Sequence, residues 1–149
     1  MSYTTTLLTN FRRIIKLYDN KLRPICGRYG LLPIEVTIIS FLNNNPGKDT
    51  AADISNLRML SKSNVSQAVE SLIQKALLQR RQDTEDRRRI HLSLTSEAKP
   101  IIREIESVRL NFRKQIFKGF TEEELKQFIQ FNNRIAENIK TETQGGELL

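Results

Sequence analysis

The sequence predicts a mainly α-helical fold with one small β-hairpin, which is an α+β class. Apolar residues recur at steps of three and four along most of the chain, as they do in amphipathic helices. After Leu77 the period changes to two, and polar residues alternate with Ile90, Leu92 and Leu94, as in a strand with one buried face. Turn-forming and cap-forming residues separate these stretches. Helices are therefore expected before and after a single hairpin.

Length and composition place the chain among globular proteins. Its 149 residues suit one domain, and folding at this size buries roughly two-thirds of the surface of the unfolded chain. With 38% hydrophobic and 28% charged residues, the chain is too apolar for a disordered protein and too charged for a membrane protein. No apolar run approaches the roughly 18 residues of a membrane-spanning helix, and the first residues lack the layout of a signal peptide. We expect a cytoplasmic protein.

The cysteine and histidine contents exclude several kinds of site. A single cysteine, Cys26, cannot form an intramolecular disulfide, and with a single histidine, His91, there is no ligand set for a structural zinc ion. We therefore expect no metal and no cofactor, and a fold whose stability rests on packing.

Three helices are expected in the first 60 residues. The first covers residues 7–29 and contains Pro24, which should kink or split it. The second has Pro33 in its first turn, where the missing N–H costs nothing, and it ends before the Asn, Pro and Gly residues at 43–47. Thr50 is the expected N-cap of the third helix.

A fourth helix should begin after Ser61, a second N-cap candidate that follows the third helix by a tight connection. Its opposite faces differ, since one is apolar and the other is polar but carries little charge. The expected buried positions are Val65, Val69, Leu72 and Ala76. Two short helices joined in this way and followed by a hairpin define a winged helix-turn-helix, here residues 33–95, whose second helix can enter the major groove of DNA.

Two further helices are expected after the hairpin. Thr95 should cap the first of them, which runs to Gly119 and whose first turns Pro100 should distort. The sequence Thr-Glu-Glu-Glu at 121–124 is a capping box for the last helix, and a polar tail is expected at 141–147. Both helices carry apolar stripes that are rich in phenylalanine.

The fourth helix offers side chains suited to reading DNA. The formal net charge of the chain is +7, which favours a polyanionic partner. Asn64 and Gln67 can each bond adenine bidentately, and serines beside them can bond base edges or phosphates. The expected DNA contacts on this helix are Lys62, Ser63, Asn64, Ser66 and Gln67. The alternative is an ordinary exposed helix face, which is also polar.

The tip of the hairpin concentrates positive charge. Its polar loop, residues 82–88, leads into a run of three arginines, Arg87, Arg88 and Arg89. Guanidinium groups on a narrow projection suit the minor groove of DNA. In this arrangement Asp86 either stands beside the arginines or pairs with Arg88 and braces the wing. The alternative is a solvated charge run, because the acidic residues of the loop cancel part of the field.

These motifs resemble the MarR (multiple antibiotic resistance regulator) family of transcription regulators. The resemblance rests on Ser-Asn-Val-Ser-Gln at 63–67, on Leu-Ile-Gln-Lys-Ala-Leu-Leu at 72–78, on Arg81, and above all on Asp-Arg-Arg at 86–88 followed at a set distance by Leu-Thr at 94–95. The long first helix and the capping box before the last helix extend it over nearly the whole chain. The family usually has Gly at the position of Ala76, so the turn into the wing departs from the family's pattern.

The resemblance implies an obligate homodimer that binds a palindromic operator in double-stranded DNA, as a repressor. Residues 1–32 and 96–149 would form the dimerisation helices. The aromatic residues in the apolar stripes of these terminal helices also favour a dimer, because they are more numerous than a monomer of this size leaves exposed. The alternative is that they complete the core of one subunit. The resemblance also implies a signal, which is either a small phenolic or anionic effector bound between the dimer helices and the DNA-binding lobe, or the oxidation of a cysteine.

Cys26 is the candidate for such a redox sensor. Arg23 and Arg28 lie close enough in the sequence to lower the pKa of its thiol if the thiol is exposed. The alternative, which the usual burial of free cysteine favours, is a small buried side chain without a redox role.

Two other functions compete with DNA binding. A helical adaptor that binds proteins would keep the winged helix and read no DNA, and the arginine wing beside an uncharged helix face argues against it. An enzyme finds little support, because no carboxylate pair, metal set or glycine-rich phosphate loop accompanies His91 in the sequence. We expect His91 to point outward from its strand as a contact to phosphate or solvent, where its charge near neutral pH would tune the wing.

Overall fold

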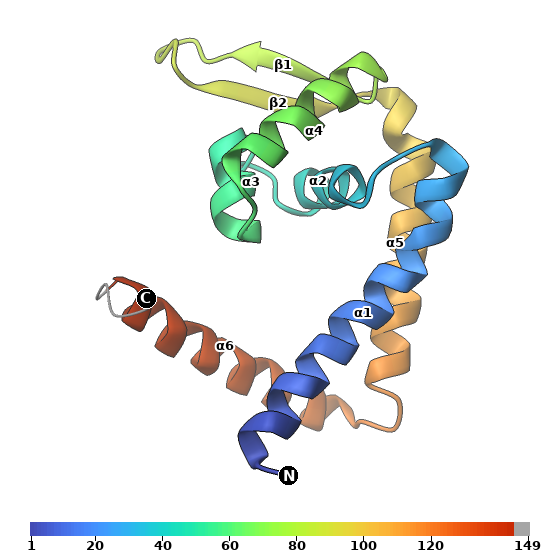
Figure 1. Ribbon diagram of the computed structural model, residues 1–149, viewed down its shortest axis with the longest axis vertical. Helices are drawn as coiled ribbons and strands as arrows, with labels where there is room; N and C mark the ends of the chain where they lie inside the picture. Colours follow the sequence, from blue (N-terminus) through green and yellow to red (C-terminus); the bar gives the residue numbers. More distant parts are fainter. Residues whose placement is uncertain (145–149) are drawn as a thin grey trace. The chain divides into compact units, whose positions relative to one another are not determined.

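The computed structural model describes residues 1–144 and confirms a mainly helical α+β fold with one antiparallel hairpin (Figure 1). The elements in chain order are α1 (Tyr3–Tyr29), α2 (Pro33–Asn44), α3 (Ala51–Arg58), α4 (Lys62–Gln74), β1 (Leu78–Gln82), β2 (Ile90–Leu94), a 3₁₀ turn (Ser96–Ala98), α5 (Lys99–Ile116) and α6 (Glu122–Gln144). The chain divides into two compact units, residues 1–112 and residues 113–149.

Helix α1 is longer than the sequence predicts and is not split. It begins after Ser2, whose hydroxyl accepts a hydrogen bond from the Thr5 N–H, and it continues through Pro24. A proline inside a helix removes one backbone hydrogen bond, and burial of the neighbouring Leu22 and Ile25 offsets that loss. The helix ends at Gly30, which has φ 63°.

The start of each of the next three helices was correctly predicted. Pro33 occupies the first turn of α2. Thr50 and Asp53 form a reciprocal capping box at α3, in which each side chain accepts a hydrogen bond from the backbone N–H of the other residue. At α4 the hydroxyl of Ser61 accepts a hydrogen bond from the Asn64 N–H. The helix-turn-helix is therefore set by local cap chemistry.

The hairpin pairs Leu78 with Leu94 and Gln82 with Ile90. Ala76, in the turn between α4 and β1, does not occupy the buried position expected for it; it is exposed and has φ 62°. The helix has ended by this residue, so the helical spacing of three and four residues no longer predicts which side chain is buried. A left-handed backbone explains why glycine suits this position.

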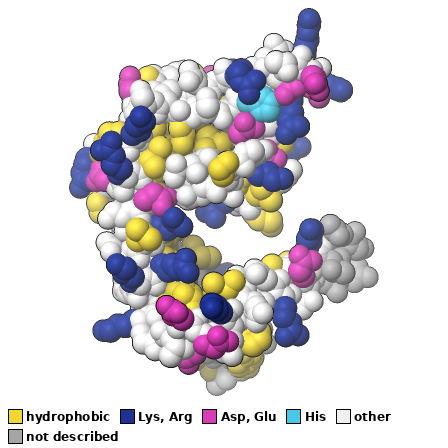
Figure 2. Space-filling view, turned by 180° about the vertical axis from the view of Figure 1, so that it is seen from behind, with side chains coloured by type: hydrophobic (Ala, Val, Ile, Leu, Met, Phe, Trp, Pro, Cys, Tyr) yellow, Lys and Arg dark blue, Asp and Glu magenta, His cyan; other side chains and the backbone are white. Residues whose placement is uncertain are grey.

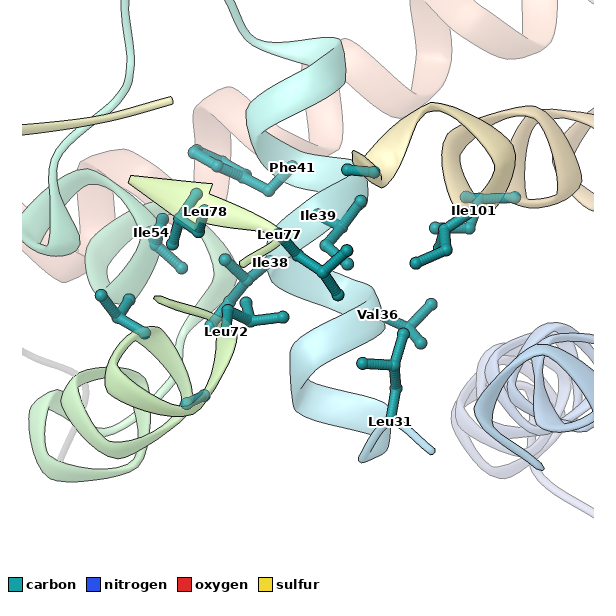
Figure 3. Packing of buried hydrophobic residues seen from close by; sticks show 14 of the residues in the cluster. Leu31, Val36, Ile38, Ile39, Phe41, Ile54, Leu72, Leu77, Leu78 and Ile101 are labelled. Atoms are coloured by element: carbon teal, nitrogen blue, oxygen red, sulfur yellow. The ribbon is translucent and has the colours of Figure 1, made fainter. Parts of the chain in front are cut away.

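The core of the first unit centres on α2 (Figure 3). Val36, Ile38 and Ile39 are fully buried, and residues from α3, α4, β1 and α5 surround them. These neighbours include Ile54, Leu72, Leu78, Ile101 and Ile105. Because α2 contributes apolar side chains on several faces, it acts as the central helix against which the helix-turn-helix and the hairpin pack.

Thr95 does not cap the helix that follows it, contrary to expectation. Its side chain makes no capping hydrogen bond and instead donates to the Ala76 carbonyl oxygen at 2.6 Å. A 3₁₀ turn then leads into α5, and Pro100 is the second residue of that helix. Within the first unit α5 lies beside α1, where the rings of Tyr18 and Phe112 are 4.8 Å apart (Figure 1).

The second unit contains the end of α5 and helix α6. The rings of Phe117, Phe120 and Phe128 pack edge to face around the connection, with centroids 5.1 to 5.4 Å apart. Thr121 and Glu124 form the predicted capping box. Helix α6 continues to Gln144, so the polar tail expected from residue 141 is helical in its first four residues. The remainder of that tail lies outside the described residues.

Over residues 1–144, no single helix has both the length and the apolar character to span a membrane, although α1 and α2, bent by 102° at their junction, meet those criteria when taken together.

Candidate nucleic-acid interface

Helix α4 presents the polar face that the sequence predicts. Lys62, Ser63, Asn64, Ser66 and Gln67 are all exposed. Among the described residues, none forms a hydrogen bond or ion pair with these five side chains, so their donors and acceptors face solvent. The first turn of α4 contains no acidic residue, and the positive end of the helix dipole is therefore not neutralised there. This end of the helix attracts an anion such as a phosphate group.

The opposite face of α4 fixes the helix in the lobe. Val65, Ala68, Val69 and Leu72 are buried in the core. Glu70 forms an ion pair with Arg80 of β1, which joins the helix to the hairpin at the surface. The two elements that are expected to touch DNA are therefore held together both by the core and by a surface ion pair.

Two aspartates shape the tip of the wing. The Asp83 carboxylate accepts hydrogen bonds from the Glu85 and Asp86 N–H groups, at 3.0 and 2.9 Å. The Asp86 carboxylate accepts one from the Arg88 N–H at 3.0 Å, and the Asp83 N–H donates to the Arg89 carbonyl oxygen at 2.9 Å. Such aspartate-to-backbone bonds close turns. The acidic residues of the loop thus determine its conformation.

The three arginines of the tip, Arg87, Arg88 and Arg89, are exposed, and Figure 2 shows basic side chains projecting from this end of the lobe. The Arg88 side chain is 94% exposed, and its Nε lies 3.7 Å from the Asp86 carboxylate. A pair this long between exposed groups contributes little. The guanidinium groups are therefore available to a ligand, while Asp86 bonds mainly to the backbone.

His91 does not point to solvent, and the expectation that it would contact phosphate or solvent was wrong. Only 16% of its side chain is exposed; Nδ1 lies 2.8 Å from Asp49 Oδ1 and Nε2 lies 2.6 Å from Asp83 Oδ1. The segment before α3 runs along β2, with the Leu92 N–H donating to the Asp49 carbonyl oxygen at 2.8 Å, and this brings Asp49 to the histidine. Hydrogen bonds to Asp83 and Asp49 raise the pKa of His91, and the bond from His91 lowers the pKa of Asp83.

An ion pair between a partly exposed lysine and a buried carboxylate fixes the other end of α4. The Lys75 ammonium donates to both oxygens of Glu35, at 2.9 and 3.0 Å, and to the Gly30 carbonyl oxygen at 2.9 Å. Glu35 is fully buried. Burial by itself would raise the pKa of Glu35, but the hydrogen bonds from the Leu32 N–H, Lys75 and Ser71 outweigh it and lower the pKa. The end of α4 is thereby tied to the junction between α1 and α2.

A cavity of about 600 Å³ lies between α1, α2 and the connection that precedes α4. Apolar residues such as Leu22, Ile34 and Leu60 line it together with Asp19, Arg23 and Thr37. Cys26 also lines it and is partly buried. Burial raises the pKa of the Cys26 thiol by more than Arg23 lowers it, which disfavours the reactive thiolate.

Comparison with known proteins shows which family this lobe is similar to. Residues 29–89 match the model of the MarR family. The part of the chain that forms the winged helix is therefore similar to the MarR family. An HTH-type transcriptional regulator of Bacillus subtilis, YsmB, is 24% identical over 140 residues, which cover 94% of this chain and 95% of the relative. The resemblance inferred from the wing and from the sequence of α4 is confirmed.

Solved structures share the fold of this chain. A MarR-family regulator from Silicibacter pomeroyi superposes with a TM-score of 0.78 at 22% identity, covering 92% of this chain and 90% of that one. The Staphylococcus aureus regulator MepR, solved in complex with DNA, superposes with a TM-score of 0.73 at 17% identity, covering 93% and 96% of the two chains.

Sequence reasoning missed several residues that shape the interface. Asp83 carries a recognisable signal, since an aspartate two and three residues before turn N–H groups is typical of an Asx turn. Glu35 carries a local signal as well, because it accepts a hydrogen bond from the Leu32 N–H at the start of α2. Asp49 and Lys75 carry none, and the pairs Asp49–His91 and Glu35–Lys75 join residues at least 40 positions apart in the chain.

Proposed function

We propose that this protein is a sequence-specific transcription regulator that binds double-stranded DNA. The observation that carries the proposal is the position of two complementary surfaces on one lobe. The unpaired polar face of α4, whose only charged member is Lys62, lies on the same compact unit as the exposed arginines of the wing. The DNA complex of the relative MepR supports the same use of this fold.

The two surfaces suit different grooves. Amide side chains of Asn64 and Gln67 on a helix of this length fit the major groove, where each can bond adenine with two hydrogen bonds. Lys62, Ser63 and Ser66 add donors to phosphates and base edges. The arginine tip of the wing is narrow and cationic, which suits the more negative minor groove. Base reading is thus assigned to α4 and positioning to the wing.

The proposal includes a homodimer on a palindromic operator. Exposed apolar residues lie along both terminal segments, 1–32 and 96–149, and a second copy of the chain would cover them. On α1 they include Leu7, Leu8, Phe11 and Ile15, and on α6 they include Phe128, Ile129, Phe131 and Ile135. A two-fold dimer would place two α4 helices about one helical turn of DNA apart. Bound there in the cytoplasm, it would act as a repressor by blocking transcription.

The cavity beside Cys26 supports regulation by a small phenolic or anionic effector. Its volume suits a small molecule, its walls are largely apolar, and Arg23 offers a cation for a carboxylate or phenolate. The raised pKa of Cys26 argues against oxidation of this thiol as the signal. An Arg23→Gln variant should weaken binding of 4-hydroxybenzoate, measured by calorimetry, more than it weakens binding of 4-methylphenol, because only the former carries a carboxylate.

Selection of bound duplexes from a fragmented genomic pool tests the function. Recovery of a palindromic site that competes well against random duplex supports the proposal. Recovery of no preferred sequence, with weak binding even at low salt, supports instead an adaptor that binds proteins. Sedimentation at micromolar concentration tests the dimer, and a chain truncated before Thr121 should sediment as a monomer and lose the operator. A monomeric full-length chain that still binds the palindrome would contradict this part.

A further inference from the structure

Three elements of the DNA-binding lobe meet at one histidine. His91 belongs to β2, Asp83 follows β1 at the base of the wing tip, and Asp49 precedes α3. The two ring nitrogens of His91 each lie within hydrogen-bond distance of a different carboxylate, at 2.8 and 2.6 Å. Figure 2 shows the histidine (cyan) among acidic side chains at the root of the projecting wing.

We propose that His91 is a positioning residue that holds the wing against the helix-turn-helix only when its imidazole is protonated. The proposal rests on the proposed function, because its consequence is that affinity for DNA falls as the pH rises.

The requirement for a proton follows from hydrogen-bond chemistry. A neutral imidazole has one N–H donor and one lone pair, whereas an imidazolium has two donors. Between two carboxylates, the neutral form satisfies one and turns its lone pair toward the other. The imidazolium satisfies both with charge-assisted bonds. The arrangement of Asp49, His91 and Asp83 is therefore complete only in the protonated state.

The bridge reaches the arginine tip through Asp83. The same carboxylate that accepts from His91 with Oδ1 accepts the Glu85 and Asp86 N–H groups with Oδ2. Loss of the bond to His91 therefore loosens the turn that presents the arginines. A loosened turn must be ordered when DNA binds, and that ordering reduces affinity.

The charged groups that face His91 determine whether the imidazolium is favoured, and therefore the direction in which pH changes DNA affinity. They are Asp83 of the wing, Asp49 of the segment before α3, and Arg81, its cross-strand partner on β1. The two carboxylates favour the imidazolium and Arg81 opposes it, and together they raise the pKa of His91 above its ordinary value of 6.5. A group whose pKa is raised by folding contributes fully below its unfolded value, and the contribution is lost as the pH rises through the folded value. Wing positioning should fail on the alkaline side.

The chain suits a direct measurement because it contains one histidine. The imidazole Cε1–H resonance of the DNA-free protein should titrate with a midpoint above 6.5. In Asp49→Asn that midpoint should move to lower pH, since one carboxylate is gone. In Glu85→Gln it should stay in place, because this variant removes a negative charge from the same wing without touching the bridge. A wild-type midpoint at or below 6.5, or an equal midpoint in Asp49→Asn, would overturn the proposal.

DNA binding supplies the second readout. Fluorescence anisotropy with the selected duplex, at fixed salt from pH 6 to pH 9, should show wild-type affinity falling roughly tenfold through the histidine midpoint, as expected for one lost charge-assisted bond. His91→Gln, which cannot take up a proton, should show a flat profile. A wild-type profile as flat as that of His91→Gln would overturn the proposal.

A comparison of two neutralising variants separates positioning from simple charge. Asp49→Asn and Glu85→Gln each make the protein more positive, so electrostatics alone predicts tighter DNA binding by both. The bridge predicts that Asp49→Asn binds several-fold more weakly than Glu85→Gln at pH 7.5. Equal affinities would overturn the positioning role. Absence of duplex binding at every pH would overturn the proposed function, and the resonance midpoints would then still report whether the bridge exists.

Discussion

Thr95 donates a hydrogen bond from its hydroxyl to the Ala76 carbonyl oxygen at 2.6 Å, and this bond joins the two ends of the hairpin. The Thr95 N–H also donates to the Leu77 carbonyl oxygen at 3.0 Å. Ala76 is thereby held at φ 62°, in a region that L-amino acids other than glycine rarely occupy. The entrance to the wing is consequently fixed in position and strained at one residue.

Ala76→Gly should stabilise the protein. A left-handed backbone costs an L-residue roughly 1 to 2 kcal/mol, and glycine removes this cost. The greater entropy of glycine in the unfolded chain offsets roughly 0.4 to 1 kcal/mol of the stabilisation. We expect a net increase of about 0.5 to 1 kcal/mol in the free energy of unfolding, measured with urea. The carbonyl that accepts from Thr95 is unchanged by the substitution.

Ala52→Gly is the matched control, because Ala52 is an exposed residue within helix α3. There the same substitution should destabilise by about 1 kcal/mol, since glycine is a poor helix former. Destabilisation by Ala76→Gly of similar size would show that Ala76 carries no strain.

Local chemistry explains which parts of the fold the sequence predicts. Thr50, Ser61 and Thr121 begin helices through bonds to residues three positions away, so the helix starts could be predicted without knowledge of the fold. The polar face of α4 likewise follows from helical periodicity alone. Thr95 and Ala76 could not be predicted correctly, because each takes its conformation from the other across 19 residues.

The same distinction applies within the candidate interface. A period of two predicts that His91 faces away from Leu92, as it does, but not that another segment covers that face. The position of Asp49 depends on how α2 and α3 pack around the core, and no pattern near residue 49 reports it. The chemistry of the wing tip was therefore visible in the sequence, whereas the groups that hold the wing in place were not.

Lys75→Met should destabilise the protein by about 3 kcal/mol at pH 7, because it leaves the buried Glu35 carboxylate without its cation. The loss should shrink on acidification. In the wild type the pKa of Glu35 is lowered, so its contribution is present above the unfolded value of 4.5 and is lost as the pH falls through the folded value. Without Lys75 the desolvation of Glu35 should dominate and raise that pKa. Protonation of Glu35 on acidification would then reduce the destabilisation of the variant.

Urea unfolding at pH 7 and pH 5 measures both effects. Lys48→Met, which replaces an exposed lysine of the α2–α3 connection, should change stability by less than about 0.5 kcal/mol at either pH. A difference between wild type and Lys75→Met that is the same at pH 5 and pH 7 would contradict the assignment of the loss to Glu35.

Asp86→Ala and Asp86→Asn should differ in DNA binding, because the Asp86 carboxylate bonds the Arg88 backbone N–H at 3.0 Å while the guanidinium is 3.7 Å away. Asparagine keeps an oxygen that accepts this N–H and loses the charge; alanine loses both. We expect Asp86→Asn to bind the selected duplex at least as tightly as wild type and Asp86→Ala to bind it several-fold more weakly, as measured by anisotropy. Equal weakening by both would mean that the charge of Asp86, through Arg88, braces the wing.

Gln67→Ala and Arg88→Ala should weaken DNA binding in different ways, since Gln67 lies on the polar face of α4 and Arg88 on the wing. Removing a bidentate amide contact should cost roughly 1 to 3 kcal/mol on the selected site and relax the preference at one base pair in each half-site. The salt dependence of DNA binding by Gln67→Ala should equal that of the wild type, because no charge is lost.

Arg88→Ala should instead weaken binding to selected and random duplex alike. Each cation–phosphate contact that is lost should reduce the slope of log affinity against log salt by about 0.9, so a dimer that loses two should change by about 1.8. Titrations at four salt concentrations, with selected and random duplex for both variants, give the slopes and the specificity ratios together. The ratio should fall for Gln67→Ala alone and the slope for Arg88→Ala alone. If the two variants change the same quantity, base reading and backbone contact are not divided between α4 and the wing, and if neither changes either quantity, this surface does not bind DNA.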